Sequence, residues 1–236
     1  GRTSSVGDGG QRVRPITSGK RVAAALRAIW NLSGRDNPYA DWVLVQVGDQ
    51  VSAMREEIKA ESAKLEQMFE KERVRGLNLK VMGSQAPVGV ELGFRSPYGF
   101  MLADVLLDVD WFARQVKTLV QKDRLSDEEG RLALYQTIKR VRQLFESVAP
   151  YQRYLLTDEL APLSRSDFLP GADEQAKKRV YAAKEIFGEV PQAIFVGETR
   201  PRHSQRKSYV TPEELALLKA VAAGEFAPAE SELGQE

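Results

Sequence analysis

A long helical pattern between residues 38 and 75 constrains the fold of this 236-residue chain more than any other feature. Asn37 followed by Pro38 is a typical helix start, because the Asn side chain caps an amide and proline fits the first helical position. Gly76 provides a natural end. Apolar residues recur in between at steps of three, four and seven: Val47, Val51, Met54, Ile58, Leu65 and Phe69. We therefore predict one helix about three times the average length, with a stripe for a core or a partner helix.

Directly after Gly76 the spacing of apolar residues changes: they no longer follow the helical period but occur at every second residue. Leu77, Leu79 and Val81 alternate with Asn78, Lys80 and Met82 over residues 77–82. A second alternating run follows at 88–94. Alternation is the pattern of a strand with one buried face, so both runs are predicted strands.

The remaining pattern is helical. Helices are predicted at 19–33, from Tyr98 to about Lys122, behind the Ser126–Glu129 capping box to about Pro150, and at 173–187 and 211–223. The predicted organisation is a flexible basic arm at 1–17, one mostly helical domain at 18–196, and a segment at 197–236 with a basic stretch, a short helix and a loose acidic tail.

The strand and two helices over 77–149 suggest a ribbon-helix-helix-like core. In such proteins one strand from each of two subunits forms a β-ribbon that fits the DNA major groove, and the helices interlock. The fold class predicted here is mainly α with a small β component, extended by the long N-terminal helix and by C-terminal helices. The alternative is an ordinary hairpin of residues 77–94 packed on helices, and the run at 88–94 is the other candidate for the pairing strand.

Composition favours a non-enzymatic protein. The chain has no cysteine and a net charge of only +1, with basic residues gathered near the start and acidic ones near the end. Its single histidine, His203, lies in a polar basic stretch, and the pair Asp104 and Asp108 has no histidine or glycine-rich loop beside it. We expect no catalytic residue, no metal site and no cofactor. Nor does any apolar run approach the roughly 20 residues that span a bilayer, so the expected location is the cytoplasm.

The candidate DNA-binding residues lie in and around the two alternating runs. Asn78 and Lys80 are predicted on the outward face, and both residue types hydrogen-bond base edges. Arg73, Arg75 and Arg95 flank the runs and are predicted to contact phosphates.

Several short motifs resemble the AcaB-like family of integrating conjugative elements and conjugative plasmids. They are the stretches 36–42 (Asp-Asn-Pro-Tyr-Ala-Asp-Trp) and 94–100 (Phe-Arg-Ser-Pro-Tyr-Gly-Phe), the helix from Leu102 to Trp111, and the Pro191 segment after Gly188. The likeness spans roughly residues 16–203. It implies a transcriptional regulator of mobile-element genes with a ribbon-helix-helix-like core.

Two functions are therefore expected, and the first is preferred over the second. The first is sequence-specific binding of double-stranded DNA by a homodimer that controls conjugative-transfer genes, with no membrane and no small-molecule substrate as partner. The second is a non-catalytic scaffold or accessory protein of the transfer or DNA-processing complex, which the long apolar stripe would also suit.

Overall fold

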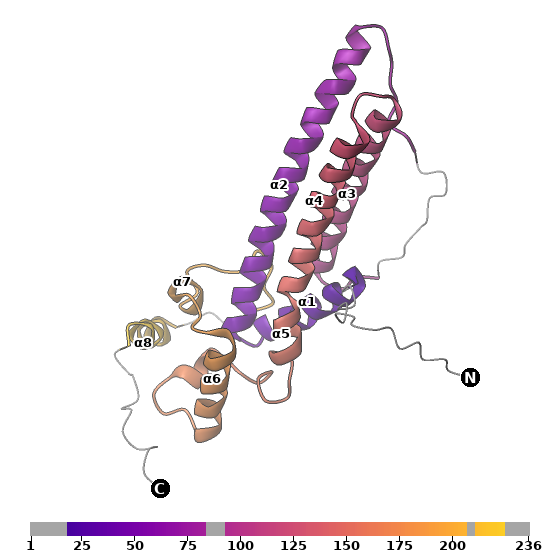
Figure 1. The fold of residues 1–236 in the computed structure, drawn as a ribbon. Helices are drawn as coiled ribbons and strands as arrows, with labels where there is room; N and C mark the ends of the chain where they lie inside the picture. The colour runs from indigo at the N-terminus through magenta and orange to yellow at the C-terminus, as the bar shows by residue number, and fades with distance from the viewer. Residues whose placement is uncertain (1–17, 84–92, 207–210, 225–236) are drawn as a thin grey trace, which may run out of the picture.

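The computed structural model describes residues 18–83, 93–206 and 211–224, and all regular structure within these ranges is helical (Figure 1). The elements are α1 (Gly19–Ser33), α2 (Pro38–Val74), α3 (Pro97–Gln121), α4 (Asp127–Ser147), α5 (Ala149–Tyr154), the 3-10 turn η1 (Arg165–Phe168), α6 (Glu174–Phe187), α7 (Gln192–Phe195) and α8 (Pro212–Ala222).

The helix starts follow from local capping chemistry. Asn37 Oδ1 accepts a hydrogen bond of 3.0 Å from the Ala40 amide, and Pro38 occupies the first helical position. At α4 the Ser126 hydroxyl accepts from the Glu129 amide while the Glu129 carboxylate accepts from the Ser126 amide. The helices predicted around these caps are confirmed, including the 37-residue α2.

Three long helices form the body of the molecule. α2, α3 and α4 lie side by side as an elongated bundle, and α1 packs against α2 and α3 near one end (Figure 1). The core lies where these four helices meet, and its members are less than a tenth exposed. They include Leu26 and Ile29 of α1, Leu44, Val47, Val51, Met54 and Ile58 of α2, Leu102, Val105, Phe112 and Val116 of α3, and Val141, Leu144 and Phe145 of α4. The stripe predicted on α2 is therefore used within the chain over much of its length.

A second, smaller apolar cluster lies among the C-terminal elements. Phe195 at the end of α7 and Val196 just after it pack with Leu218 of α8 and with half-buried Phe168 of η1. The rings of Phe168 and Phe195 lie 5.0 Å apart, edge to face. This cluster joins η1, α7 and α8 beside the end of the bundle where α2 begins (Figure 1).

The two Pro-Tyr helix starts bind C-terminal backbone. The Tyr39 hydroxyl donates to the Gly188 carbonyl at 2.8 Å, and the Tyr98 hydroxyl donates to the His203 carbonyl at 2.9 Å. Both rings are buried. Burial raises the pKa of Tyr98 to about 12, so its hydroxyl keeps the proton that it donates. The family-like motifs at 36–42 and 94–100 thus hold the C-terminal part of the chain against the bundle.

Replacing Tyr98 with Phe is expected to lower the free energy of unfolding by about 1–3 kcal/mol, because the His203 carbonyl loses a partly buried partner while the ring remains. Urea unfolding followed by circular dichroism measures the change. Tyr181→Phe is the matched control, since Tyr181 is 68% exposed. Equal stability of the two variants would mean that the Tyr98 hydroxyl does not hold the C-terminal segment.

A buried arginine connects three parts of the chain. Arg165 is 2% exposed and donates to the Asp41 carboxylate at 2.8 Å and to the Asp36 carboxylate at 2.7 Å. It also donates to the backbone carbonyls of Phe195 at 2.6 Å and Ile194 at 2.8 Å. The start of α2, the turn η1 and the end of α7 are therefore fixed to one guanidinium group.

Asp36 is the most strained member of this network. Its backbone adopts φ +67°, in the left-handed region that side chains other than glycine seldom occupy. Burial raises the pKa of its carboxyl, and the charges of Arg165 and Arg206 oppose that rise. The Arg206 guanidinium lies 3.0 Å from Asp36 Oδ1. Two arginines thus compensate one strained, largely buried carboxylate.

The predicted ribbon-helix-helix core is wrong. Residues 77–83 form no strand, and the described residues contain no sheet. The alternation has a different physical cause: Leu79 and Val81 are half-buried beside α2 and α3, while Leu77, predicted to face the core, is 45% exposed. One-sided burial against helices produces the same period of two as a sheet.

The second predicted strand gains no support where it is described. Residues 84–92 lie outside the described ranges, and Gly93 and Phe94 are not in a strand. Instead the half-buried Phe94 ring packs edge to face with Phe100 at 5.8 Å. The predicted arm at 1–17 and the acidic tail also lie outside the described residues. The domain division at residue 196 stays a prediction.

Candidate nucleic-acid interface

The far end of α2 is shaped by a glycine turn. Gly76 adopts φ +91°, and its amide donates to the Arg73 carbonyl at 2.9 Å. The Leu77 amide donates to the Glu72 carbonyl, also at 2.9 Å. This pair of bonds satisfies the last carbonyls of the helix and needs the left-handed backbone that glycine adopts without strain. The chain consequently turns back after α2.

Residues 77–83 run back beside the groove between α2 and α3. The Met82 amide donates to Thr118 Oγ1 at 2.9 Å, and the same hydroxyl donates to the Arg114 carbonyl at 2.7 Å. A shallow groove of about 210 Å³ lies here, lined by Glu66, Phe69, Glu70, Arg73, Asn78, Leu79, Val81, Trp111 and Gln115. Trp111 is 41% exposed, so an aromatic ring lies at the surface beside Asn78.

The arginines predicted to contact phosphates at this end are both exposed, and each is paired with a glutamate of its own helix. Arg73 donates two bonds of 2.7 Å to Glu70, and this hydrogen-bonding raises the pKa of the guanidinium. Arg75 lies 3.0 Å from Glu72. The Arg73–Glu70 pair lies at the surface and is weak, so a phosphate could replace Glu70 as the partner of Arg73.

Glu72 also joins α2 to the loop between α3 and α4. It is buried and lies 3.1 Å from Arg124 as well as close to Arg75. One carboxylate thus holds two guanidinium groups from different segments at the same end of the bundle.

Basic residues outnumber acidic ones in the segments that meet here, which are 70–83 and 114–125. The basic residues are Lys71, Arg73, Arg75, Lys80, Arg114, Lys117, Lys122 and Arg124, and the acidic ones are Glu70, Glu72 and Asp123. Asn78 and Lys80 are both exposed, as predicted. The excess of positive charge suits an anionic partner. We call the set Lys71, Arg73, Arg75, Asn78 and Lys80 the basic end.

Arg95 lies apart from the basic end. It is exposed and directly precedes α3, whose 25 residues run away from it toward the basic end. At 1.5 Å per residue that helix is about 36 Å long. The structure therefore brings four of the five predicted DNA-binding residues together and leaves the fifth near the opposite end of the bundle (Figure 1).

Sequence reasoning missed the contributions of Lys71, Lys122 and Arg124. Lys71 precedes the predicted strand by two turns, and the other two reach this end from the loop after α3. The alternating pattern drew attention to residues 77–82 alone. A count of charges at both predicted helix ends would have found the additional lysines.

The aspartate pair on α3 has a structural partner. Arg55 of α2 donates to Asp108 at 2.6 Å and to Asp104 at 3.2 Å, so the pair fixes α3 against α2. In the part of the chain that the structure describes, no group of three or more His, Asp or Glu side chains is placed to hold a metal ion.

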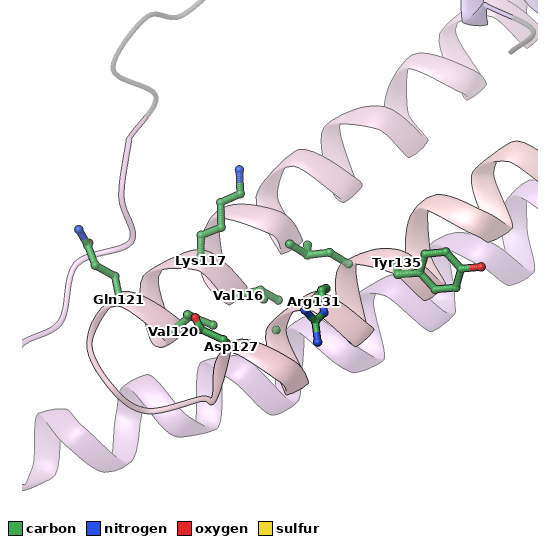
Figure 2. A pocket seen from close by; sticks show the side chains of 9 residues that line it. Val116, Lys117, Val120, Gln121, Asp127, Arg131 and Tyr135 are labelled. Atoms are coloured by element: carbon green, nitrogen blue, oxygen red, sulfur yellow. The ribbon is translucent and has the colours of Figure 1, made fainter. Parts of the chain in front are cut away.

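A second groove lies between α3 and α4 (Figure 2). It has a volume of about 510 Å³ and is lined mainly by apolar groups, among them Val116, Val120 and Leu134. The two helices approach closely at Gly130, where a Cβ would lie 2.5 Å from a Val120 methyl group. Figure 2 shows Lys117 extending outward from α3, and the Tyr135 ring of α4 among the side chains that line the groove.

The protein is helical, and its longest helix ends at an exposed basic surface. These two features are those of a binding protein. The chain belongs to the AcaB family: the family described as "Transcriptional regulator AcaB" matches residues 1–207. The protein is therefore a transcriptional regulator. Neither the curated proteins nor the solved structures contain a match to this chain. Among the described residues, every helix is too short or too polar to cross a membrane.

Proposed function

We propose that this regulator binds double-stranded DNA sequence-specifically and controls conjugative-transfer genes of a mobile element. The observation that carries the proposal is the basic end, where Asn78 and Lys80 lie exposed just after the two arginines at the end of α2. Asn and Lys pair with adenine and guanine edges, and exposed arginines pair with phosphates. The family match supports a role in transcription, and the resemblance to proteins of conjugative elements supports the choice of target genes.

The geometry favours contact by an exposed end of a helical bundle. The arginines at the end of α2 would position the protein on the phosphate backbone, and the residues just after Gly76 would face the bases. Asn78 lies near the carboxylates of Glu66 and Glu70, which repel phosphates. A base edge, which is not charged, is thus the better partner for Asn78.

We further propose that the protein acts as a homodimer on DNA. A two-fold dimer presents two basic ends, and regulators of this kind bind two half-sites whose symmetry matches their own. Doubling the contacts raises the ratio of specific to non-specific binding without any new type of contact.

The test of the DNA contact is the double variant Asn78→Ala, Lys80→Ala. Specific affinity for the promoter DNA of the host element is expected to fall about tenfold or more, because a good base contact is worth about 1–3 kcal/mol of discrimination. Affinity for scrambled DNA should fall less, since phosphate contacts remain. Competition gel-shift assays on both DNAs measure the difference, and melting curves check folding.

Arg95→Ala is the comparison variant. The sequence pattern predicted that Arg95 contacts a phosphate. Arg95 lies far from the basic end, however, so if DNA touches only that end, Arg95→Ala should bind DNA like the wild type. A double variant that binds its specific site like the wild type would reject reading by Asn78 and Lys80. Absence of DNA binding by the wild type would favour the scaffold function instead.

A further inference from the structure

The short helix α1 presents one row of polar and small side chains to solvent. At about 100° per residue, four of its exposed residues fall within about 60° of one another around the helix axis. They are Lys20, Ala24, Arg27 and Asn31, and exposed Arg21 lies at one edge of the row. We call these five residues the α1 face. The opposite side of the helix is buried in the core through Val22, Leu26 and Ile29.

The α1 face carries positive charge that no carboxylate of its own helix balances. Lysines on other helices pair with a glutamate three residues away, as Lys59 does with Glu56. Lys177 of α6 pairs with Glu174 in the same way. The chain has no Asp or Glu between Ser18 and Arg35, so α1 offers no such partner. The row therefore suits a polyanion.

Two of the cations on α1 oppose the helix dipole. Lys20 and Arg21 occupy the first turn, where the positive end of the dipole disfavours cations, and the last turn, where cations stabilise, has none. Helix stability therefore does not account for these two residues. A phosphate group at this end of α1 would be attracted by both side chains and by the dipole.

The residue types along the row are those that recognise bases in the major groove. Arg pairs with guanine and Asn with adenine, each through two hydrogen bonds, and Ala contacts the thymine methyl group. These are the types of Arg27, Asn31 and Ala24. The row from Lys20 to Asn31 is about 16 Å long, and an α-helix fits the major groove. Recognition helices read bases through three or four side chains of this kind.

The α1 face lies far from the basic end. α1 packs at the end of the bundle where α2 begins (Figure 1). The basic end lies at the other end of the 37-residue α2, which is about 54 Å long. A change in one surface therefore leaves the other in place, and the two can be tested separately.

We propose that the α1 face is a second DNA-contacting surface, which enters the major groove of double-stranded DNA. Arg27 and Asn31 contact base edges, and Lys20 and Arg21 contact phosphates. The match to the regulator family covers residues 1–207 and so includes α1. This inference goes beyond the proposed function, which assigns DNA contact to the basic end, and rests on it only for the choice of DNA as the partner.

The first experiment removes the phosphate contacts with Lys20→Ala, Arg21→Ala. The slope of log affinity against log salt should decrease by about 2, because each contact contributes about 0.9. At roughly 0.1 M salt, promoter DNA of the host element and scrambled DNA should both bind about tenfold or more weakly. Both residues are exposed and Ala is the best helix former, so melting curves should match the wild type. Lys177→Ala, Lys178→Ala on α6 removes the same charge and should leave the slope unchanged.

The second experiment removes the base contacts with Arg27→Lys, Asn31→Ala. Lysine keeps the charge of Arg27 but lacks the planar fork that makes two bonds to guanine. Affinity for the promoter DNA should fall about tenfold or more, while scrambled DNA should bind as it does to the wild type. Competition gel-shift assays measure both. Adding Asn78→Ala, Lys80→Ala should multiply the two losses, because the surfaces are far apart.

Direct contact is tested by photo-cross-linking. The chain has no cysteine, so Ala24→Cys provides a single site for a photoreactive label on the α1 face. The label should cross-link to the promoter duplex. Tyr181→Cys is the matched control, since Tyr181 is 68% exposed on α6, and its label should not cross-link.

The α1 face would be ruled out by wild-type DNA binding of both α1 variants, or by equal cross-linking from residues 24 and 181. Preferential cross-linking to single-stranded RNA would also overturn it. Normal binding by the α1 variants, with impaired binding by Asn78→Ala, Lys80→Ala, would leave the proposed function standing without this inference. The reverse result would keep the α1 face as the contact and reject base reading by Asn78 and Lys80.

Discussion

Replacing Arg165 with Met is expected to lower the free energy of unfolding by about 3–5 kcal/mol, the cost of leaving buried charge without its partner. Two carboxylates, Asp36 and Asp41, lose the guanidinium that lies 2.7–2.8 Å from them. Two backbone carbonyls at the end of α7 lose a donor in the same change. A loss of this size is a large part of the stability of an ordinary domain. Chemical denaturation followed by circular dichroism measures it.

The loss of unfolding free energy in the Arg165→Met variant should depend on pH. Burial already raises the pKa of Asp36, and Arg165 opposes that rise, so its removal raises the pKa further. A carboxyl whose folded pKa lies above its unfolded value costs stability once the pH passes the unfolded value, and the cost grows until the pH exceeds the folded one. The difference between wild type and variant should therefore shrink as the pH falls from 7 toward about 4.

Arg140→Met is the matched control for this prediction. Arg140 pairs with Glu57 of α2, and both side chains are about half exposed. Such a pair contributes about 0–1 kcal/mol, so this variant should unfold close to the wild type. A loss at Arg165 no larger than that at Arg140 would mean that the buried network adds little to the fold.

Removing four cations from the basic end should reduce DNA binding more than any single substitution. In the variant Lys71→Ala, Arg73→Ala, Arg75→Ala, Lys80→Ala, the slope of log affinity against log salt should decrease by about 3, because Lys71, Arg73 and Arg75 each contribute about 0.9 as phosphate contacts. At roughly 0.1 M salt this corresponds to more than a hundredfold weaker binding of scrambled DNA, and specific DNA should lose more because Lys80 is also a base contact. Fluorescence anisotropy over a salt series measures both quantities.

The control variant removes four cations elsewhere. Lys59, Lys64, Lys177 and Lys184 are exposed and paired with glutamates of α2, α6 or the following turn. Changing all four to Ala gives the same change in net charge. If both variants reduced the slope equally, binding would depend on overall charge and not on the basic end.

Local chemistry was sufficient to predict the longer helices α1, α2, α3, α4, α6 and α8, whereas the short elements α5, η1 and α7 were not predicted. Asn37 with Pro38, and the Ser126–Glu129 capping box, each satisfy amides within one turn, so their effect is visible in a few neighbouring residues. The apolar stripe of α2 likewise predicted a buried face, and the core contains its members from Val47 to Ile58. The family resemblance, which rests on short motifs, was confirmed by the family match.

The fate of residues 77–83 was decided by tertiary structure. Alternation records only that one side is buried, and the sequence does not say whether a strand or a pair of helices covers that side. Here the groove of α2 and α3 covers Leu79 and Val81, and a threonine side chain takes the hydrogen bond of Met82 that a sheet would have taken. The exposure of Asn78 and Lys80 was nevertheless predicted, whereas Met82, predicted on the same outward face, is half-buried.

What the sequence by itself determined is thus what neighbouring residues settle among themselves: where helices start and end, and which faces are apolar. Tertiary structure alone decided the contacts between distant segments. Arg165 meets Asp41 and Asp36 across 124 and 129 residues of chain, and Arg95 is separated from Arg73 by the length of α3. The physical reason is that a buried charge takes whichever partner the packed helices bring within hydrogen-bonding distance, and no local pattern encodes that partner.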